Sequence, residues 1–66
     1  MDVYDVVELQ EAVPHEHLAA GAVGTIIHIF DRDPVAYEVE FTDEDGRTVS
    51  MLTLTAAQLR PSTRGG

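Results

Sequence analysis

The chain has 66 residues, no cysteine, and twelve acidic against four basic side chains, which gives a formal net charge of −8. A chain of this size forms one small domain that buries only about 60% of its unfolded surface. Without cysteine it has neither disulfides nor thiolate metal sites. Four scattered arginines argue against binding to nucleic acid or to an anionic membrane, whereas a basic protein partner would be attracted.

The first twenty residues predict a strand followed by a long loop. Residues 3–9 are rich in strand-forming side chains and predict the first strand. Residues 10–20 are irregular, and within them residues 15–20 are expected to make one helical turn that ends at Gly21, a suitable C-cap. Leu18 is expected to hold this loop against the core.

Two glycines lead into the second predicted strand, residues 23–30. Gly21 and Gly24 can adopt a positive φ, or lie where another backbone passes closely. The β-branched side chains that follow fit a pleated, buried surface. Alternation places His28 outward if the isoleucines on either side of it point inward.

The next segment predicts a β-hairpin. Residues 36–42 alternate strictly, so that aromatic and aliphatic side chains face inward and two glutamates face water. Residues 43–46 end in Asp-Gly, a strong hairpin-turn signal. Residues 47–55 return antiparallel, and we expect a bulge near Met51 because two apolar pairs there fall on opposite faces.

The end of the chain predicts a closing turn. Thr55 is expected to cap a 3₁₀ turn, Leu59 to plug one end of the fold, and Arg60 to begin a very short last strand. Together these elements predict an all-β, SH3-like barrel of about five short antiparallel strands, with a long first loop and a 3₁₀ turn before the C-terminus. Residues 1–61 form this single domain, and residues 62–66 are expected to be a flexible tail.

The residues expected to contact a partner are polar or aromatic and lie outside the predicted core. They are Tyr4, His28, Glu38, Glu40, Asp43 and Glu44. Paired carboxylates perform acid–base chemistry only in a pocket that separates their pKa values, which so small a barrel hardly offers. The sequence also lacks a hydroxyl beside a catalytic base. We therefore expect no enzymatic activity, no catalytic residues and no cofactor.

A metal site at the first loop is the weaker of two interpretations. His15, Glu16 and His17 offer ligands, but the imidazoles would converge only on an extended backbone. A third ligand would have to come from elsewhere, for example Glu11 or His28. Structural zinc sites usually show tighter, paired spacing. A solvated polar loop is favoured, and no metal is expected.

Several motifs carry a family resemblance, in the order YDVVEL (4–9), GAVGTIIHIF (21–30), AYEVEFTDEDGRT (36–48) and LTLTAAQLR (52–60). Together they resemble the bacterial family known as domain of unknown function 4926. The resemblance implies a stand-alone SH3-like barrel without catalytic residues, of the kind that forms toxin–antitoxin or immunity pairs with a co-encoded small protein. The family usually has Lys-Gly-Asp where this chain has Ala20-Gly21-Ala22, so no role of those charged residues carries over.

Two functions follow as hypotheses. The first is a non-enzymatic acidic binding module for another protein, expected to be basic, with an antitoxin- or immunity-like role. The alternative is an accessory or structural subunit of a larger enzyme, because the turn at 21–25 is also similar to that of KOW-type and nitrile-hydratase-accessory barrels. No signal-peptide pattern and no apolar run of ~20 residues is present, so we expect the cytoplasm and no membrane association. Homo-oligomerisation is left open.

Overall fold

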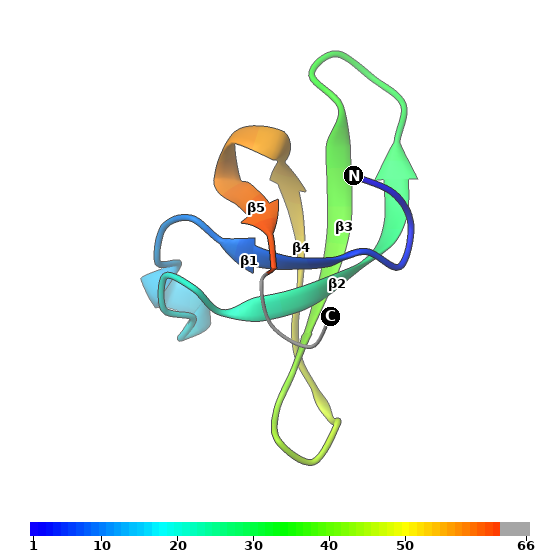
Figure 1. The fold of residues 1–66 in the computed structure, drawn as a ribbon. Coiled ribbons are helices and arrows are strands. Elements are labelled where there is room, and N and C mark those ends of the chain that lie inside the picture. Colours follow the sequence, from blue (N-terminus) through cyan, green and yellow to red (C-terminus); the bar gives the residue numbers. More distant parts are fainter. Residues whose placement is uncertain (63–66) are drawn as a thin grey trace.

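The fold is a five-stranded antiparallel sheet that curls into a small barrel, seen in a computed structural model that describes residues 1–62 (Figure 1). Its elements are β1 (Val6–Leu9), η1 (Pro14–Glu16), β2 (Val23–Phe30), β3 (Ala36–Thr42), β4 (Thr48–Thr55), η2 (Ala56–Gln58) and β5 (Leu59–Pro61). The strands lie in the order β4-β3-β2-β1-β5, and η1 and η2 are 3₁₀ turns. This architecture confirms the predicted all-β, SH3-like class. Among the described residues, no helix is long and apolar enough to cross a membrane.

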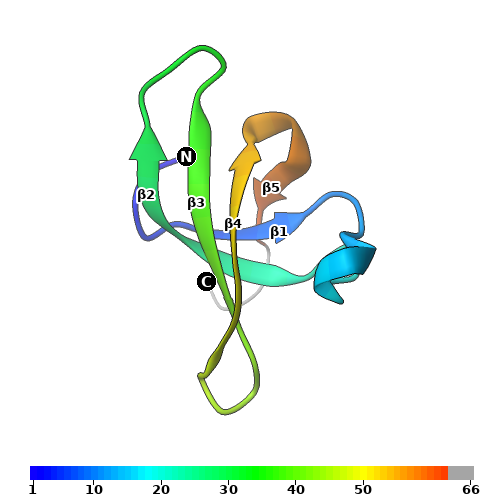
Figure 2. The same ribbon diagram turned by 180° about the vertical axis from the view of Figure 1, so that it is seen from behind.

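Strand β2 is bent, and the bend lets one sheet wrap around one core. Figures 1 and 2 show β1 crossing β3 and β4, while β2 begins beside β1 and ends beside β3. The register of β2 against β3 shifts between Ile26, which pairs with Val39, and His28, which pairs with Glu38. Ile27 is therefore an extra residue, and such a bulge bends a strand and increases its twist.

The core lies on the concave face of the sheet. Directly paired residues share a face, so the pairs Ile26–Val39 and Val39–Leu52 place three aliphatic side chains in one row. The core residues are Val7, Leu9, Ile26, Tyr37, Val39, Phe41, Leu54 and Leu59. Burying each large aliphatic or aromatic side chain contributes about 1.5–3 kcal/mol before the cost of chain ordering.

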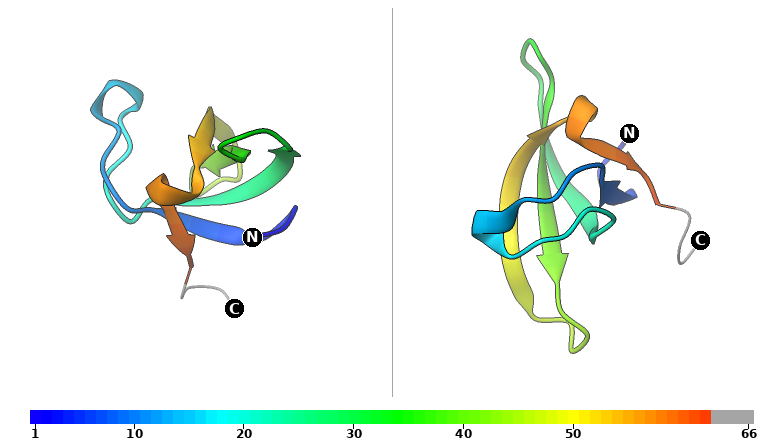
Figure 3. Two further views of the ribbon diagram at one scale, coloured as in Figure 1. Left: turned by 90° about the horizontal axis from the view of Figure 1, so that it is seen from above. Right: turned by 90° about the vertical axis from the view of Figure 1, so that its left-hand side faces the viewer.

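The turn η2 closes the barrel between its two edge strands, β4 and β5 (Figure 3). Gln10 holds this turn in place. Its backbone N–H donates to the carbonyl of Gln58 at 2.9 Å, and its side-chain amide donates to the carbonyls of Leu59 at 2.8 Å and Ala57 at 3.2 Å. Leu59 is buried behind these bonds, as predicted for the plug at this end.

Two predictions for the N-terminal third are wrong. The first strand begins at Val6 rather than at residue 3, because Tyr4 has a φ of 73°, which an extended strand does not allow. The predicted helical turn over 15–20 is instead the 3₁₀ turn Pro14–Glu16, closed by His17 at φ 58° rather than by Gly21. Leu18 packs against the core, as expected for the residue that holds this loop.

The second hairpin agrees with its prediction, apart from the bulge. The bounds of β3 and the turn after it are confirmed, and Gly46 has the positive φ of 80° that an Asp-Gly turn requires. The register shift lies at Val49, between the pairs Thr42–Thr48 and Phe41–Ser50, two residues before Met51. From Ser50 to Thr55 the pairing is regular, so the apolar pairs that suggested a bulge are explained by simple alternation.

The prediction of a flexible tail falls mostly on residues 63–66, which lie outside the described residues. Ser62 belongs to that predicted tail and is described. Its backbone N–H donates to the carbonyl of Val6 at 3.1 Å, which continues the β1–β5 pairing by one bond.

Candidate functional site

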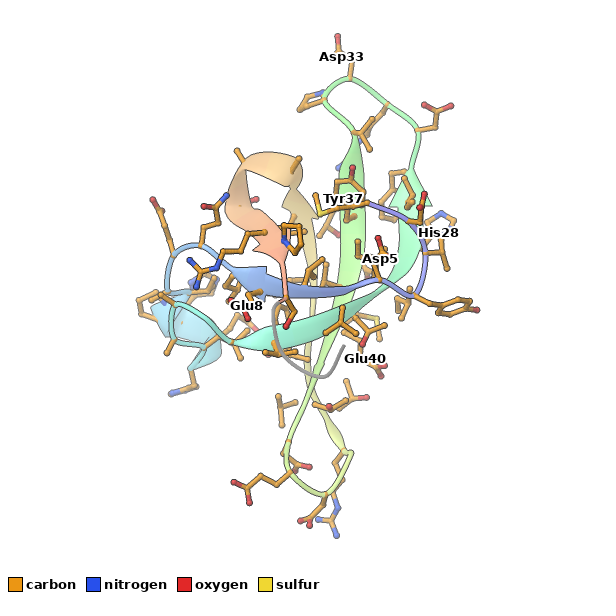
Figure 4. All side chains as sticks on the ribbon, in the orientation of Figure 1. Asp5, Glu8, His28, Asp33, Tyr37 and Glu40 are labelled. Atoms are coloured by element: carbon orange, nitrogen blue, oxygen red, sulfur yellow. The ribbon has the colours of Figure 1, made fainter. Side chains whose placement is uncertain are left out.

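The candidate site is the convex side of strands β2, β3 and β4. We call this surface the outer face and define it by the residues that the pairing aligns on that side: Thr25, His28, Phe30, Glu38, Glu40, Met51 and Thr53. Figure 4 shows two of the predicted contact residues there, His28 on β2 and Glu40 on β3.

The two outward glutamates are held by hydroxyl groups of the neighbouring strand. Thr53 Oγ1 donates to Glu38 Oε1 at 2.7 Å, and Thr48 Oγ1 donates to Glu40 Oε2. Both glutamates are partly exposed, as the alternation of β3 predicted. Because each carboxylate has its position fixed by a hydrogen bond, it presents a defined negative group to a partner at little further entropic cost.

Beside the glutamates lies a short stack of ring and cation groups. The rings of His28 and Phe30 meet edge to face with centroids 4.7 Å apart, and the guanidinium carbon of Arg32 lies 5.4 Å from the Phe30 ring centre. His28 is exposed and pairs directly with Glu38 across the sheet, so its outward placement is confirmed. The outer face therefore combines aromatic side chains with carboxylates, and the guanidinium of Arg32 lies next to it over the Phe30 ring.

Asp43 and Glu44 do not belong to this face. They lie in the β3–β4 turn, which Figure 1 shows projecting away from the barrel. Asp43 Oδ1 accepts the backbone N–H groups of Asp45 at 2.9 Å and Arg47 at 3.0 Å. Asp43 therefore shapes its own turn, a structural role that the sequence reading missed although the residue type favours it.

Among the large hydrophobic side chains of residues 1–62, Tyr4 is the most exposed, at 76%. Its backbone N–H donates to the carbonyl of Ile26 at 2.6 Å. Asp2 and Asp5 close a small turn around it: the Asp2 N–H donates to Asp5 Oδ2 at 2.8 Å, and the Asp5 N–H donates to the Asp2 carbonyl at 3.1 Å. This turn fixes Tyr4 at its positive φ, a conformation that costs a β-carbon residue about 1–2 kcal/mol. Tyr4 therefore stands beside the Ile27 bulge at the margin of the outer face.

We expect Tyr4→Asn to leave the free energy of unfolding unchanged or to raise it by up to about 1 kcal/mol. Asparagine tolerates a positive φ, and the exposed ring contributes little burial in the free protein. Urea denaturation of the two proteins measures the difference. A loss of more than 1 kcal/mol would show that the ring packs against the barrel.

The three histidines do not meet. His15 and His17 are exposed on either side of Glu16, whose carboxylate is bound by Ser50, and His28 lies on β2. Across residues 1–62, no group of three potential metal ligands forms a site. Of the four aromatic side chains, Tyr37 and Phe41 are in the core, Phe30 is half-buried on the outer face, and Tyr4 is exposed.

Sequence reasoning missed two features of the structure. The first is the exposure of apolar side chains on β4, where Val49 is 53% and Met51 48% exposed. The alternation of Val49 and Met51 with Ser50 and Leu52 along the strand could have predicted this exposure. The second is the buried carboxylate of Glu8, which no neighbouring residue in the sequence predicts.

Comparison with known proteins agrees with the motif resemblance. No curated protein and no solved structure matches the chain. The family model described as "Domain of unknown function (DUF4926)" matches residues 3–61, nearly the whole chain. This match covers all five strands of the barrel. The chain therefore belongs to the DUF4926 family.

Proposed function

We propose that this protein is a non-enzymatic binding module of the bacterial cytoplasm, and that its partner is a small basic protein encoded beside it, as in antitoxin or immunity pairs. The observation that carries the proposal is the outer face, where the carboxylates of Glu38 and Glu40 are held in place beside exposed His28 and half-exposed Met51. Protein interfaces typically combine such apolar and aromatic side chains with charged groups at the rim.

The charge of the molecule supports a basic partner. With a net charge of −8, the whole chain attracts a cationic protein, and the oriented carboxylates of Glu38 and Glu40 define the surface that the partner contacts. A toxin that acts on nucleic acid has a basic active site, and an acidic β-surface would occupy it. The competing function is an accessory subunit of a larger enzyme, which the same binding experiment detects through a different partner.

The test begins with the tagged protein recovered from its host together with whatever it binds. The recovered partner is then purified and titrated with the barrel. We expect a small basic protein that binds in a 1:1 ratio and loses its own activity on binding. Recovery of a large enzyme whose activity depends on the barrel would favour the accessory function. A purified neighbouring protein that neither binds nor is inhibited would overturn the proposal.

Charge reversal tests the assignment of the outer face. We expect Glu38→Lys with Glu40→Lys to slow association by about tenfold, because the local attraction becomes repulsion. Each substitution removes one surface hydrogen bond, so the cost to folding is about 1 kcal/mol per site. Stopped-flow association kinetics at low and physiological salt measure the effect.

The matched control makes the same change in net charge elsewhere. Asp31→Lys with Asp33→Lys alters the β2–β3 loop, whose tip carries Asp33 well away from Glu40 (Figure 4). We expect this variant to slow association by about twofold only, through the long-range field. Equal slowing of association in both variants would show that net charge alone sets the association rate, without a defined contact surface.

A further inference from the structure

Strand β4 is a sheet edge with little of the usual protection. It is the last strand on one side of the sheet, and its eight residues include no charged residue, no proline and no glycine. Soluble proteins usually blunt such edges with charges, proline, bulges or short strands. The opposite edge, β5, has three residues and ends in Pro61, which has no N–H to donate. Beyond its one bulge at Val49, β4 therefore presents a regular edge.

The free backbone groups of β4 can be assigned from its last residue. The N–H of Thr55 donates to Gln58 Oε1 at 2.9 Å, so Thr55 directs its backbone away from β3. In an antiparallel strand, the backbone N–H and C=O groups of alternate residues point the same way. Because the register is regular here, the backbone groups of Met51 and Thr53 also point away from β3, toward the open edge of the sheet. Within residues 1–62, no backbone hydrogen bond from outside the β3–β4 ladder reaches either residue, and both side chains are exposed.

Carboxylates flank this uncharged strand on both of its faces. Glu38 and Glu40 lie over it from β3 on the outer face. On the inner face, Ser50 Oγ donates to Glu16 Oε1 at 2.9 Å, which brings a carboxylate of the first loop to the same strand. A further strand paired with β4 would lie about 5 Å from it and about 10 Å from β3. Lysine or arginine side chains on that strand reach these carboxylates.

We propose that β4 accepts an extended, basic segment of the partner protein as a sixth strand of the sheet. The inference rests on the proposed function and specifies how the partner binds: backbone hydrogen bonds at Met51 and Thr53 supply the pairing, and the flanking carboxylates select basic side chains. A second copy of this chain is the weaker occupant, because pairing β4 with β4 would bring the same carboxylates together between two molecules of charge −8.

The first experiment uses two synthetic ten-residue peptides, one alternating lysine with valine and one alternating glutamate with valine. Each is added to the full, ¹⁵N-labelled chain, and amide hydrogen exchange is followed by NMR. We expect saturating lysine peptide to slow exchange at Met51 and Thr53 by about tenfold or more, since each bound N–H must open before it exchanges. The amide of Glu44 in the hairpin turn serves as the internal control. The glutamate peptide is expected to have no effect.

Two substitutions at one exposed position separate charge from shape. We expect Met51→Lys to weaken binding of the lysine peptide by about tenfold, whereas Met51→Glu retains or strengthens it. Replacing the Leu52–Thr53 amide by an ester, in a chemically synthesised chain, removes the Thr53 N–H and also makes the Leu52 carbonyl a weaker acceptor. We expect it to weaken binding by about three- to tenfold. An ester at Glu44 is the matched control and should leave binding unchanged.

Each contrary outcome has a separate meaning. If the partner protein binds and Met51 and Thr53 stay unprotected, the edge inference is wrong and the proposed function stands. If neither the lysine peptide nor any basic protein binds, both are wrong. If sedimentation shows a dimer with these amides protected before peptide is added, then the edge pairs with itself, and the inference is overturned.

Discussion

Gly24→Ala is expected to destabilise the barrel by about 3 kcal/mol, and Gly24→Val to prevent folding. A β-carbon built at Gly24 would lie 2.7 Å from Val39 Cγ1, 2.9 Å from Phe41 Cε1 and 2.9 Å from the backbone oxygen of Glu40. Side chains could rotate away, but the Glu40 carbonyl belongs to the β2–β3 ladder, so the two strands themselves must separate. A domain of 66 residues is stable by only about 3–10 kcal/mol.

Gly46→Ala is the matched comparison, because the two glycines are needed for different reasons. Gly46 has a φ of 80°, and a β-carbon placed on it would have no neighbour within 4 Å, whereas Gly24 lies outside the positive-φ region and is crowded. We expect Gly46→Ala to cost about 1–2 kcal/mol, from backbone strain alone. Urea denaturation followed by circular dichroism measures both. A Gly24→Ala protein as stable as the wild type would mean that β2 and β3 are not packed this closely.

The sequence indicates that Gly24 needs either a positive φ or a close approach of another backbone, and the structure selects the second. The choice depends on Glu40 and Phe41, which stand opposite Gly24 through the β2–β3 register. Register across strands is a long-range property, and one sequence shows only local periodicity. The same limit explains the misplaced bulge: Val49 looks like any other strand residue, and only its pairing partners reveal it as the extra one.

The local sequence predicts the structure correctly where a single turn or a single strand determines it. The alternation of β3 predicted its bounds and the outward position of Glu38 and Glu40, and Asp-Gly located the hairpin turn. Three residues expected to contact a partner, His28, Glu38 and Glu40, therefore lie on one face. The structural role of Asp43 was not predicted: in the folded turn its carboxylate accepts hydrogen bonds from two backbone N–H groups.

Glu8 shows the largest gap between sequence and structure. It lies on β1 (Figure 4), within a strand pattern that indicated no special role. The residue is nevertheless only 7% exposed. Glu8 Oε1 accepts a bond from Arg60 Nε at 3.0 Å, and Oε2 accepts one from Ser62 Oγ at 3.2 Å. Arg60 is 52 positions away in sequence, and β1–β5 pairing brings the two residues directly opposite each other. This ion pair joins the first and last strands.

We expect Arg60→Met to lower the free energy of unfolding by about 2 kcal/mol, since it removes an arginine that forms an ion pair with a buried carboxylate. The cost stays below that of a fully buried pair because the Arg60 side chain is 49% exposed. Arg47→Met, an exposed arginine in the hairpin turn, is the control and should change stability by less than about 0.5 kcal/mol.

The double variant distinguishes an ion pair from simple packing. Glu8→Met combined with Arg60→Met replaces both charges by apolar side chains of similar length, a change that is often neutral when the pair was buried. We therefore expect the double variant to be at least about 1 kcal/mol more stable than Arg60→Met alone, as measured by urea denaturation in a double-mutant cycle. If the two single costs simply add, Glu8 and Arg60 stabilise the barrel independently. The first and last strands would then be held together by the β1–β5 backbone ladder rather than by charge.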